Sequence, residues 1–281
     1  MVAIIVHGGA GKANSKEEIP QRIETCKNAA LEGYKILKDG GTAIDAAVKA
    51  VMIFENDPLF NAGIGSYLNE QGEVELDAGI MDGSTLKIGA VSGIKHVKNP
   101  IVLARSIMEN SKHNFLIGEG AEEFAIKQNI KLVPNEYFIT RKKKKIFLSK
   151  FGDTVGAVAL DKFGRIVSAV STGGTPNKSK GRVGDSPLVG SGFYANKSYG
   201  AVATGIGEDI MKAVLTFRIS LKLNEGIKTA TESAIHYLTD INGKAGVIAL
   251  DSSGNIAFYY NTEMMFYGYM YEGMENPEGG I

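Results

Sequence analysis

A strand–turn–strand unit occurs twice in the second half of this chain, and it limits the possible folds more than any other feature. Residues 156–166 and 246–256 match in spacing, and each copy places Ala-Leu-Asp two residues before a turn glycine. This pattern predicts a β-hairpin in each copy. Helical patterns at 208–223 and 226–239 lie between the copies. Strands in runs, separated by paired helices, favour an α+β fold of stacked sheets with helices outside over regular βαβ alternation.

The first half shows the same mixture of elements. Its opening residues 2–6 are apolar and β-rich, and they predict a buried strand that stops at His7 and enters a tight glycine loop. The further elements that we expect are helices at 17–38, from an N-cap at Thr42 to before Asp57, at 100–109 and at 119–128, and strands at 74–81 and 86–94. Residues 134–151 have no periodicity and contain the basic run 141–145, which predicts an exposed linker.

The composition excludes several classes of partner. Thirty-one basic residues balance 31 acidic ones, so no long-range field of one sign draws the protein to nucleic acid or to an anionic membrane. No apolar run reaches the roughly 20 residues that span a bilayer, and the first residues do not form a signal peptide. We therefore expect one cytoplasmic domain without nucleic-acid or membrane partners. The single cysteine, Cys26, excludes an internal disulfide.

Several common catalytic and binding motifs are missing from the sequence. It contains no Gly-x-Ser-x-Gly elbow, no phosphate-binding P-loop and no Gly-x-Gly-x-x-Gly motif, although it has 35 glycines. The four histidines lack the spacing of metal ligands, and we expect them to be structural or exposed. What remains is a set of glycine, hydroxyl and charged residues, each of which taken alone is typical of ordinary turns. The set comprises Thr154 and residues 171–174, 181–187 and 203–208.

Taken together, these motifs closely resemble those of the plant-type L-asparaginase and isoaspartyl peptidase family, whose members are N-terminal-nucleophile threonine hydrolases. The resemblance covers nearly the whole chain. It rests on His7-Gly-Gly-Ala-Gly, Phe60-Asn-Ala-Gly-Ile-Gly, Leu76-Asp-Ala, Met81-Asp-Gly, Gly118-Glu-Gly-Ala, Asp153-Thr-Val-Gly-Ala-Val-Ala-Leu-Asp, Gly181-Arg-Val-Gly-Asp-Ser-Pro and Thr204-Gly-x-Gly-Glu. It implies a four-layer αββα sandwich with two stacked, mainly antiparallel sheets. It also implies a single domain, 1–281, that cuts itself into subunits 1–153 and 154–281, with the basic linker at about 134–153 before the cut.

The resemblance assigns a role to each candidate site residue. Thr154 would attack the carbonyl of Asp153, become a new N-terminus and then serve as nucleophile, with its own α-amine as base. Thr172 would orient that amine, and Asn61 would support the site. The Thr204 hydroxyl and the Gly205 N–H would stabilise the oxyanion.

The same resemblance implies the ligands. Arg182 would bind the α-carboxylate of L-asparagine or of a β-aspartyl dipeptide, and Asp185 with the Gly207 carbonyl would bind its α-ammonium group. No cofactor is implied. A structural sodium ion would be held by the backbone carbonyls of Phe54, Glu55, Asp57, Phe60, Ala62 and Ile64. Two cleaved pairs would associate as a dimer.

Two alternatives remain open on the sequence. Asp153 stands where asparaginase-like members usually have glycine, which is closer to glycosylasparaginases, whereas residues 171–174 favour asparaginases. A non-catalytic binding protein of the same fold, which never cleaves itself, is the alternative from a different class.

Overall fold

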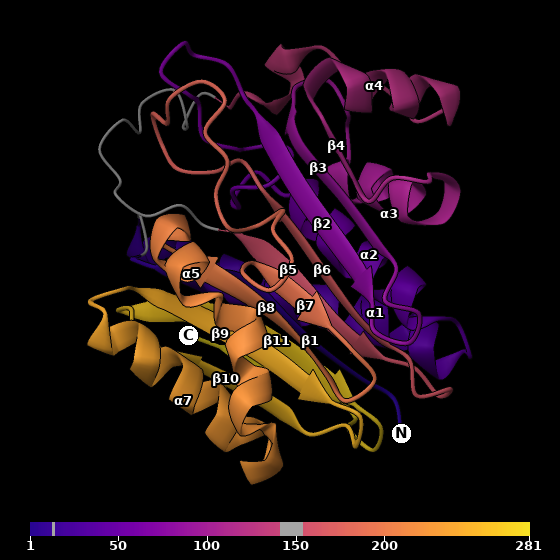
Figure 1. Ribbon diagram of the computed structural model, residues 1–281, viewed down its shortest axis with the longest axis vertical. Coiled ribbons are helices and arrows are strands. Elements are labelled where there is room, and N and C mark those ends of the chain that lie inside the picture. Colours follow the sequence, from indigo (N-terminus) through magenta and orange to yellow (C-terminus); the bar gives the residue numbers. More distant parts are fainter. Residues whose placement is uncertain (13–14, 141–153) are drawn as a thin grey trace.

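The computed structural model describes residues 1–12, 15–140 and 154–281, and it contains two β-sheets packed face to face (Figure 1). The larger sheet has eight strands that come from both halves of the chain. In spatial order they are β12 (Glu278–Gly280), β11 (Met264–Tyr271), β1 (Ala3–Gly11), β5 (Val155–Leu160), β6 (Ile166–Thr172), β2 (Leu76–Asp82), β3 (Ile88–Ile94) and β4 (Phe115–Ile117). Neighbouring strands are antiparallel except for the parallel pair β3 and β4.

The smaller sheet is antiparallel and has four strands. Their spatial order is β10 (Ile256–Tyr260), β9 (Ala245–Asp251), β8 (Tyr199–Gly205) and β7 (Phe193–Ala195). This sheet packs against the centre of the larger one, with β8 over β5 and β6, and β9 over β1. Both predicted hairpins are confirmed, because β5 pairs with β6 and β9 pairs with β10.

Helices cover the outer face of each sheet, which completes four layers. Three helices pack on the larger sheet: α1 (Ile19–Lys38), α2 (Ala43–Glu55) and α3 (Pro100–Asn110), with α4 (Gly118–Lys127) beside β3 and β4. The smaller sheet is covered by α5 (Gly207–Ala213), α6 (Leu215–Arg218) and α7 (Ile227–Asp240), which lie on the opposite side of the molecule from α1 and α2 (Figure 1). Short 3₁₀ helices are η1 (Lys16–Glu18), η2 (Asn135–Phe138) and η4 (Ile219–Glu225). The predicted αββα architecture is confirmed.

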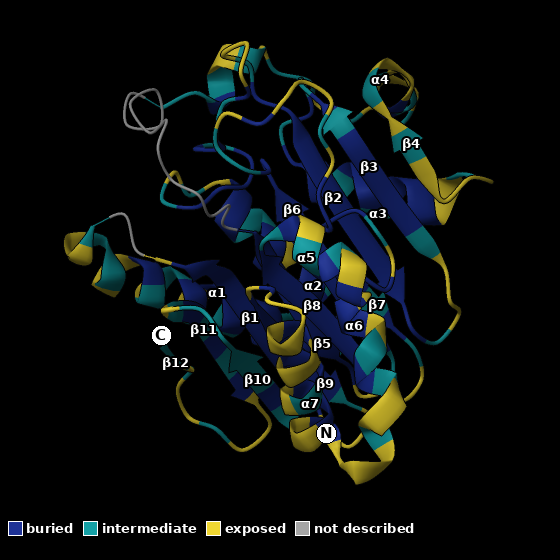
Figure 2. Cartoon of the chain, turned by 60° about the vertical axis from the view of Figure 1, so that its left-hand side comes forward, coloured by how far each residue is buried: buried dark blue, intermediate teal, exposed yellow. Residues whose placement is uncertain are grey.

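The central strands are buried on both faces, and they separate two apolar cores. In β1, Ile4 and Val6 belong to the core under the helices, whereas Ala3 and Ile5 belong to the core between the sheets. Because side chains alternate along a strand, a strand between two apolar layers needs a continuous apolar run. Figure 2 shows the result, with buried strands at the centre and exposed residues on the outer surfaces of the helices.

Three sequence-based predictions about these elements were wrong. The first strand does not stop at His7, because β1 continues to Gly11 through an irregularity between His7 and Ala10. The predicted helix at 208–223 is broken at Val214, whose backbone is left-handed with φ of 48°. The linker does not begin at residue 134, because η2 places Phe138 in the core.

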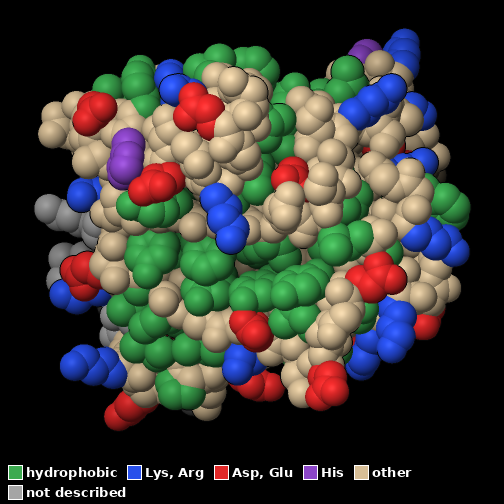
Figure 3. All heavy atoms as spheres, turned by 90° about the horizontal axis from the view of Figure 1, so that it is seen from below, with side chains coloured by type: hydrophobic (Ala, Val, Ile, Leu, Met, Phe, Trp, Pro, Cys, Tyr) green, Lys and Arg blue, Asp and Glu red, His purple; other side chains and the backbone are tan. Residues whose placement is uncertain are grey.

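Charged side chains of both signs surround a band of hydrophobic side chains on the face seen in Figure 3. This mixture agrees with the formal net charge of zero. No helix in the described ranges is long and apolar enough to cross a membrane.

Candidate active site

Three threonines, each within or next to a different strand, lie close together at one end of the sandwich. Thr154 directly precedes β5, Thr172 ends β6, and Thr204 lies near the end of β8 in the facing sheet. The antiparallel register pairs Val155 with Ser171, which brings Thr172 beside Thr154. All three side chains are buried. The sheet topology therefore assembles residues that are 18 and 50 positions from Thr154 in the sequence.

The Thr154 hydroxyl has two hydroxyl neighbours. Its Oγ1 lies 3.4 Å from Thr172 Oγ1 and 3.2 Å from Ser186 Oγ. Ser186 is buried, and it was not among the predicted site residues. Its sequence signal was its position next to Asp185 in the Gly181–Pro187 motif. The nucleophile candidate thus lies among hydroxyl groups that can hydrogen-bond to its oxygen and orient it.

The Thr154 nitrogen lies beside Thr204 in the uncut chain. Its N–H donates to Thr204 Oγ1 at 3.3 Å, and the Ala10 N–H donates to the same oxygen at 3.3 Å. A hydroxyl has two acceptor sites and one donor, so two incoming N–H groups leave the Thr204 O–H to donate to a third group. This arrangement suits the oxyanion role that the sequence predicts for Thr204.

Gly205 lies next to Thr204 in a backbone conformation that excludes side chains. Its φ is 144°, and a Cβ there would lie 2.6 Å from backbone atoms of Lys244 and Ala245. The position therefore requires glycine, and it leaves the backbone open toward the pocket.

Thr172 and Asn61 organise the turn after β6. Thr172 Oγ1 accepts from the Gly174 N–H at 3.0 Å. Asn61 Nδ2 donates to the Gly174 carbonyl at 2.6 Å, and Asn61 Oδ1 accepts from the Tyr67 N–H at 2.8 Å. Thr172 contacts the hydroxyl of Thr154 here, whereas the nitrogen of Thr154 contacts Thr204. Asn61 holds the turn, and neither of its two hydrogen bonds involves Thr154.

Arg182 pairs with Glu208 and not with Asp185. Its Nε and Nη2 donate to the two Glu208 carboxylate oxygens at 2.9 and 2.8 Å. No ion pair between Arg182 and Asp185 is found in the described part of the chain, so neither side chain neutralises the other through a direct salt bridge. A guanidinium has five N–H donors, so the Nη1 edge remains available for a second carboxylate.

Asp185 is a buried carboxylate with an unused acceptor. Its side chain is 4% exposed, and Oδ2 has no hydrogen-bond partner among the described residues. Burial raises the pKa of this carboxyl to about 7. A Cβ at Gly207 would lie 2.9 Å from both Asp185 Oδ1 and Arg182 Nη2, so glycine keeps this corner open.

These groups line one narrow pocket. Its lining includes the predicted catalytic residues Thr154, Thr172 and Gly205, together with the predicted ligand-binding residues Arg182, Asp185 and Gly207. A larger groove between β10 and β11 is lined by Tyr259, Tyr269 and Tyr271 and contains none of the predicted site residues. The structure therefore brings the predicted nucleophile and the predicted ligand-binding residues together in one place.

The proposed sodium-binding loop leads out of α2. The carbonyls of Phe54, Glu55 and Asp57 accept backbone hydrogen bonds from within the loop. Those of Phe60, Ala62 and Ile64 accept none from the described residues. Gly63 is left-handed at φ 54°, and a Cβ there would lie 2.3 Å from the Glu55 carbonyl oxygen. Backbone carbonyls in a tight loop fit a hard monovalent cation, which would brace the loop.

Two sequence-based predictions lie outside the described residues. Asp153, on the other side of the proposed cleavage bond, and the basic run 141–145 belong to that part of the chain.

Comparison with known proteins gives consistent matches over the whole length. A family model described as Asparaginase matches residues 1–150 and 143–277. The plant-type L-asparaginase of Pyrococcus horikoshii is 43% identical over 310 residues, with 100% of both chains covered. The isoaspartyl peptidase/L-asparaginase of Mus musculus is 44% identical over 274 residues, which cover 90% of this chain and 83% of the mouse protein. The Danio rerio protein of the same name is 44% identical over 93% of this chain and 90% of its own.

Proposed function

Because the chain belongs to the asparaginase family and is an amide-bond hydrolase, we propose that it cuts itself before Thr154 and then hydrolyses L-asparagine and β-aspartyl dipeptides. The names of the relatives favour these two substrates. They give no support to the glycosylasparaginase alternative, whose only sequence feature is Asp153.

The observation that carries this proposal is the buried Asp185 carboxylate beside Arg182 in the pocket of Thr154. An unpaired buried acceptor is costly unless a ligand satisfies it. An α-ammonium group would pair with Asp185, and an α-carboxylate would take the remaining Arg182 edge. A ligand held in this way is an amino acid whose side chain points toward Thr154.

Self-cleavage uses the uncut threonine. Thr154 Oγ attacks the carbonyl carbon of residue 153 and forms an ester with it. The peptide nitrogen is the leaving group, and it takes up the hydroxyl proton to become the α-amine of Thr154. Water then hydrolyses the ester, so that residue 153 ends in a carboxylate and Thr154 becomes an N-terminus. The hydroxyls of Thr172 and Ser186 lie beside the attacking oxygen and can orient it.

Hydrolysis then uses the new amine as the base. The amine takes the proton of Thr154 Oγ as the oxygen attacks the side-chain amide of the substrate. Thr204 Oγ–H and Gly205 N–H stabilise the oxyanion, and the protonated amine gives its proton to the departing ammonia or amino acid. Water attacks the β-aspartyl ester, L-aspartate leaves and Thr154 is restored.

Assays with three substrates test this proposal. We expect release of ammonia from L-asparagine and release of the second amino acid from a β-aspartyl dipeptide. Preferred turnover of a glycosylasparagine would favour the glycosylasparaginase alternative. A chain that stays uncut and turns over none of the three substrates would favour the non-catalytic alternative.

Two further parts of the proposal concern the folded particle. The loop 54–64 binds a sodium ion through backbone carbonyls, with a structural role only. The cleaved pair associates with a second pair, in keeping with the prevalence of two-fold assemblies.

A further inference from the structure

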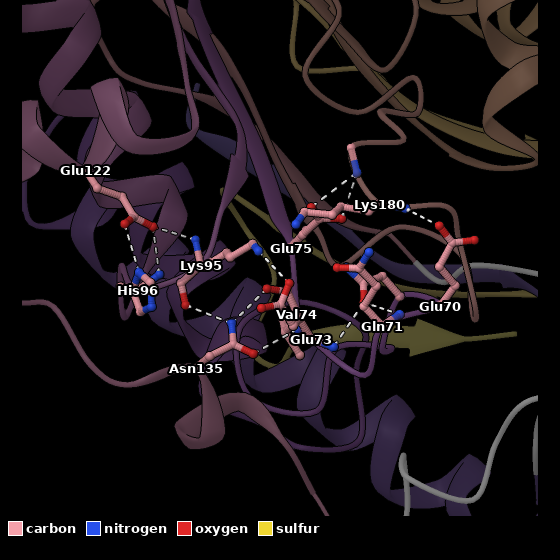
Figure 4. Close-up of polar contacts among 12 residues, drawn as sticks. Glu70, Gln71, Glu73, Val74, Glu75, Lys95, His96, Glu122, Asn135 and Lys180 are labelled. Carbon is pink, nitrogen blue, oxygen red and sulfur yellow. Dashed lines mark hydrogen bonds and ion pairs between the residues drawn. The ribbon is translucent and has the colours of Figure 1, made fainter.

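The segment that carries Arg182 is attached to a loop from the other half of the chain. Residues 177–180 bond to residues 68–70 through Asn177 N–H to the Leu68 carbonyl and Glu70 N–H to the Lys178 carbonyl, both at 2.9 Å. The Lys180 N–H also donates to Glu70 Oε1 at 3.2 Å. Figure 4 shows Glu70, Glu75 and Lys180 gathered at this junction. After cleavage before Thr154, these contacts would join the two fragments.

Among the contacts between these two segments, the one made by Glu75 lies closest in sequence to Arg182. Both of its carboxylate oxygens accept from the Gly181 N–H, each at 3.2 Å. Gly181 is left-handed at φ 78°, and the Arg182 N–H closes a turn onto the Ser179 carbonyl at 2.9 Å. The carboxylate therefore fixes the peptide group immediately before Arg182.

Burial distinguishes Glu75 from the other acidic residues of its loop. Glu75 is buried, whereas the side chain of Glu73 is 41% exposed and pairs with Lys95 (Figure 4). Lys178 is also buried, and its Nζ donates to the main-chain carbonyl of Glu75 at 3.0 Å, which ties the segment of Arg182 to the backbone of Glu75. A buried carboxylate whose two oxygens share one backbone N–H has few alternative positions.

Arg182 is thus held at both ends. Glu75 fixes its backbone through Gly181, and Glu208 fixes its guanidinium group. Glu208 lies in the same half of the chain as Arg182, whereas Glu75 lies in the other half.

We propose that Glu75 is a positioning residue for substrate binding, which acts by holding the Gly181–Arg182 peptide so that the guanidinium meets the substrate's α-carboxylate. This inference rests on the proposed function, because it requires Arg182 to bind that carboxylate. It places a determinant of substrate affinity in the fragment that does not contain the nucleophile. Because Arg182 does not touch Thr154 in the contacts described above, the loss should fall on KM while kcat and self-cleavage are maintained.

Steady-state kinetics of Glu75→Gln with L-asparagine tests the inference. Glutamine keeps the shape of the side chain but removes its charge, and weakening one charge-assisted hydrogen bond corresponds to roughly a tenfold change in affinity. We expect KM to rise about tenfold, kcat to stay within about twofold and cleavage to remain complete. Glu73→Gln is the matched control on the same loop, with KM at the wild-type value.

A double-mutant cycle separates positioning from a general structural effect. In an Arg182→Ala background, Glu75→Gln should change KM no further, because the group that it positions is gone. An unchanged KM in Glu75→Gln, a selective fall in kcat, or a full additional KM increase in the Arg182→Ala background would overturn the inference. If Glu75→Gln does not fold, Glu75→Asp takes its place, and it should raise KM in the same direction.

The controls distinguish this inference from the proposed function. If neither the wild type nor Glu73→Gln hydrolyses L-asparagine or β-aspartyl dipeptides, the proposed function is contradicted. The inference then loses its basis as well. Active wild type with unaffected Glu75 variants would contradict the inference alone.

Discussion

At the scale of single residues, the oxygen of Thr154 is defined by its two hydroxyl neighbours. Thr172 Oγ1, at the end of β6, lies 3.4 Å from it, and Ser186 Oγ, in the segment that follows Arg182, lies 3.2 Å from it. A hydroxyl with two such neighbours has few orientations open to it, which favours a fixed direction of attack.

Replacing Ser186 should slow catalysis more than it weakens binding. Ser186→Ala removes one hydrogen bond to the nucleophile, and such a bond contributes about 0.5–1.5 kcal/mol. We expect kcat to fall by roughly two- to tenfold with little change in KM for L-asparagine. Ser253→Ala, in the exposed turn between β9 and β10, serves as the control. A kcat of Ser186→Ala equal to that of the control would remove Ser186 from the reaction.

Asp185 should give the protein a characteristic pH dependence. Burial raises the pKa of its carboxyl to about 7, so the group is mainly neutral below that pH and cannot pair fully with an α-ammonium group. We expect kcat/KM for L-asparagine to rise as the pH increases through about 7. Asp185→Asn should have a lower kcat/KM, and its pH profile should no longer rise through about 7. The only remaining rise should be the one that reflects deprotonation of the Thr154 amine. Profiles measured from pH 5 to 9 check this, and an identical rise through about 7 in Asp185→Asn would count against the assignment.

The sequence predicted Thr154, Arg182 and Asp185 because family motifs carry them, but it did not predict the contacts that organise them. Ser186 and Glu208 stand inside quoted motifs and still gave no sign of their partners, since a contact across 32 or 26 positions depends on how loops pack. The sequence around Glu75 did not predict a role for this residue. Its role depends on a loop more than 100 positions away.

At the scale of elements, the ends of strands β5, β6 and β8 position the three threonines of the candidate active site. The burial of β1, β5 and β6 on both faces was readable from their apolar runs, and both hairpins were readable from their turn glycines. The irregularity in β1 was not predictable, because His7-Gly8-Gly9 is equally typical of a loop. Pairing with β5 ends at His7, and it is the pairing of Ala10 and Gly11 with β11 that continues the strand. The break at Val214 was also hidden, since valine has no local preference for a left-handed backbone.

The loop after α2 gives a prediction at this scale. If its carbonyls bind sodium, the folded state gains free energy of RT ln(1 + [Na⁺]/Kd), about 1.4 kcal/mol at ten times Kd. Thermal unfolding should then occur at a higher temperature in sodium chloride than in tetramethylammonium chloride of equal ionic strength. Gly63→Ala, which crowds the Glu55 carbonyl, should abolish the difference. Equal midpoints for the wild-type protein in the two salts would contradict the sodium site.

At the scale of the whole molecule, the two proposed fragments share one sheet. Strand β1 of the first half lies between β11 and β5 of the second, and β2 of the first half pairs with β6 of the second. Cutting before Thr154 would leave this pairing in place, because the cut falls before β5 begins. The αββα layers were predictable from a full-length family resemblance, whereas the order of strands in the sheet depends on long-range pairing that the sequence does not reveal.

We expect the cleaved fragments to co-elute in native gel filtration and to separate only in denaturant, without any disulfide between them, since the chain has one cysteine. Light scattering should give the mass of two cleaved pairs. A single pair in solution would contradict the assembly proposal, and fragments that separate under native conditions would contradict the shared sheet.

The N-terminal sequence of the active protein tests the central claim most directly. We expect two N-termini under denaturing conditions, one at the start of the chain and one reading Thr-Val-Gly from Thr154. Thr154→Ala should show only the first, and it should release no ammonia from L-asparagine. An active wild-type protein without the Thr-Val-Gly terminus, or a Thr154→Ala variant cut at the same bond, would show that Thr154 is not a self-generated N-terminal nucleophile.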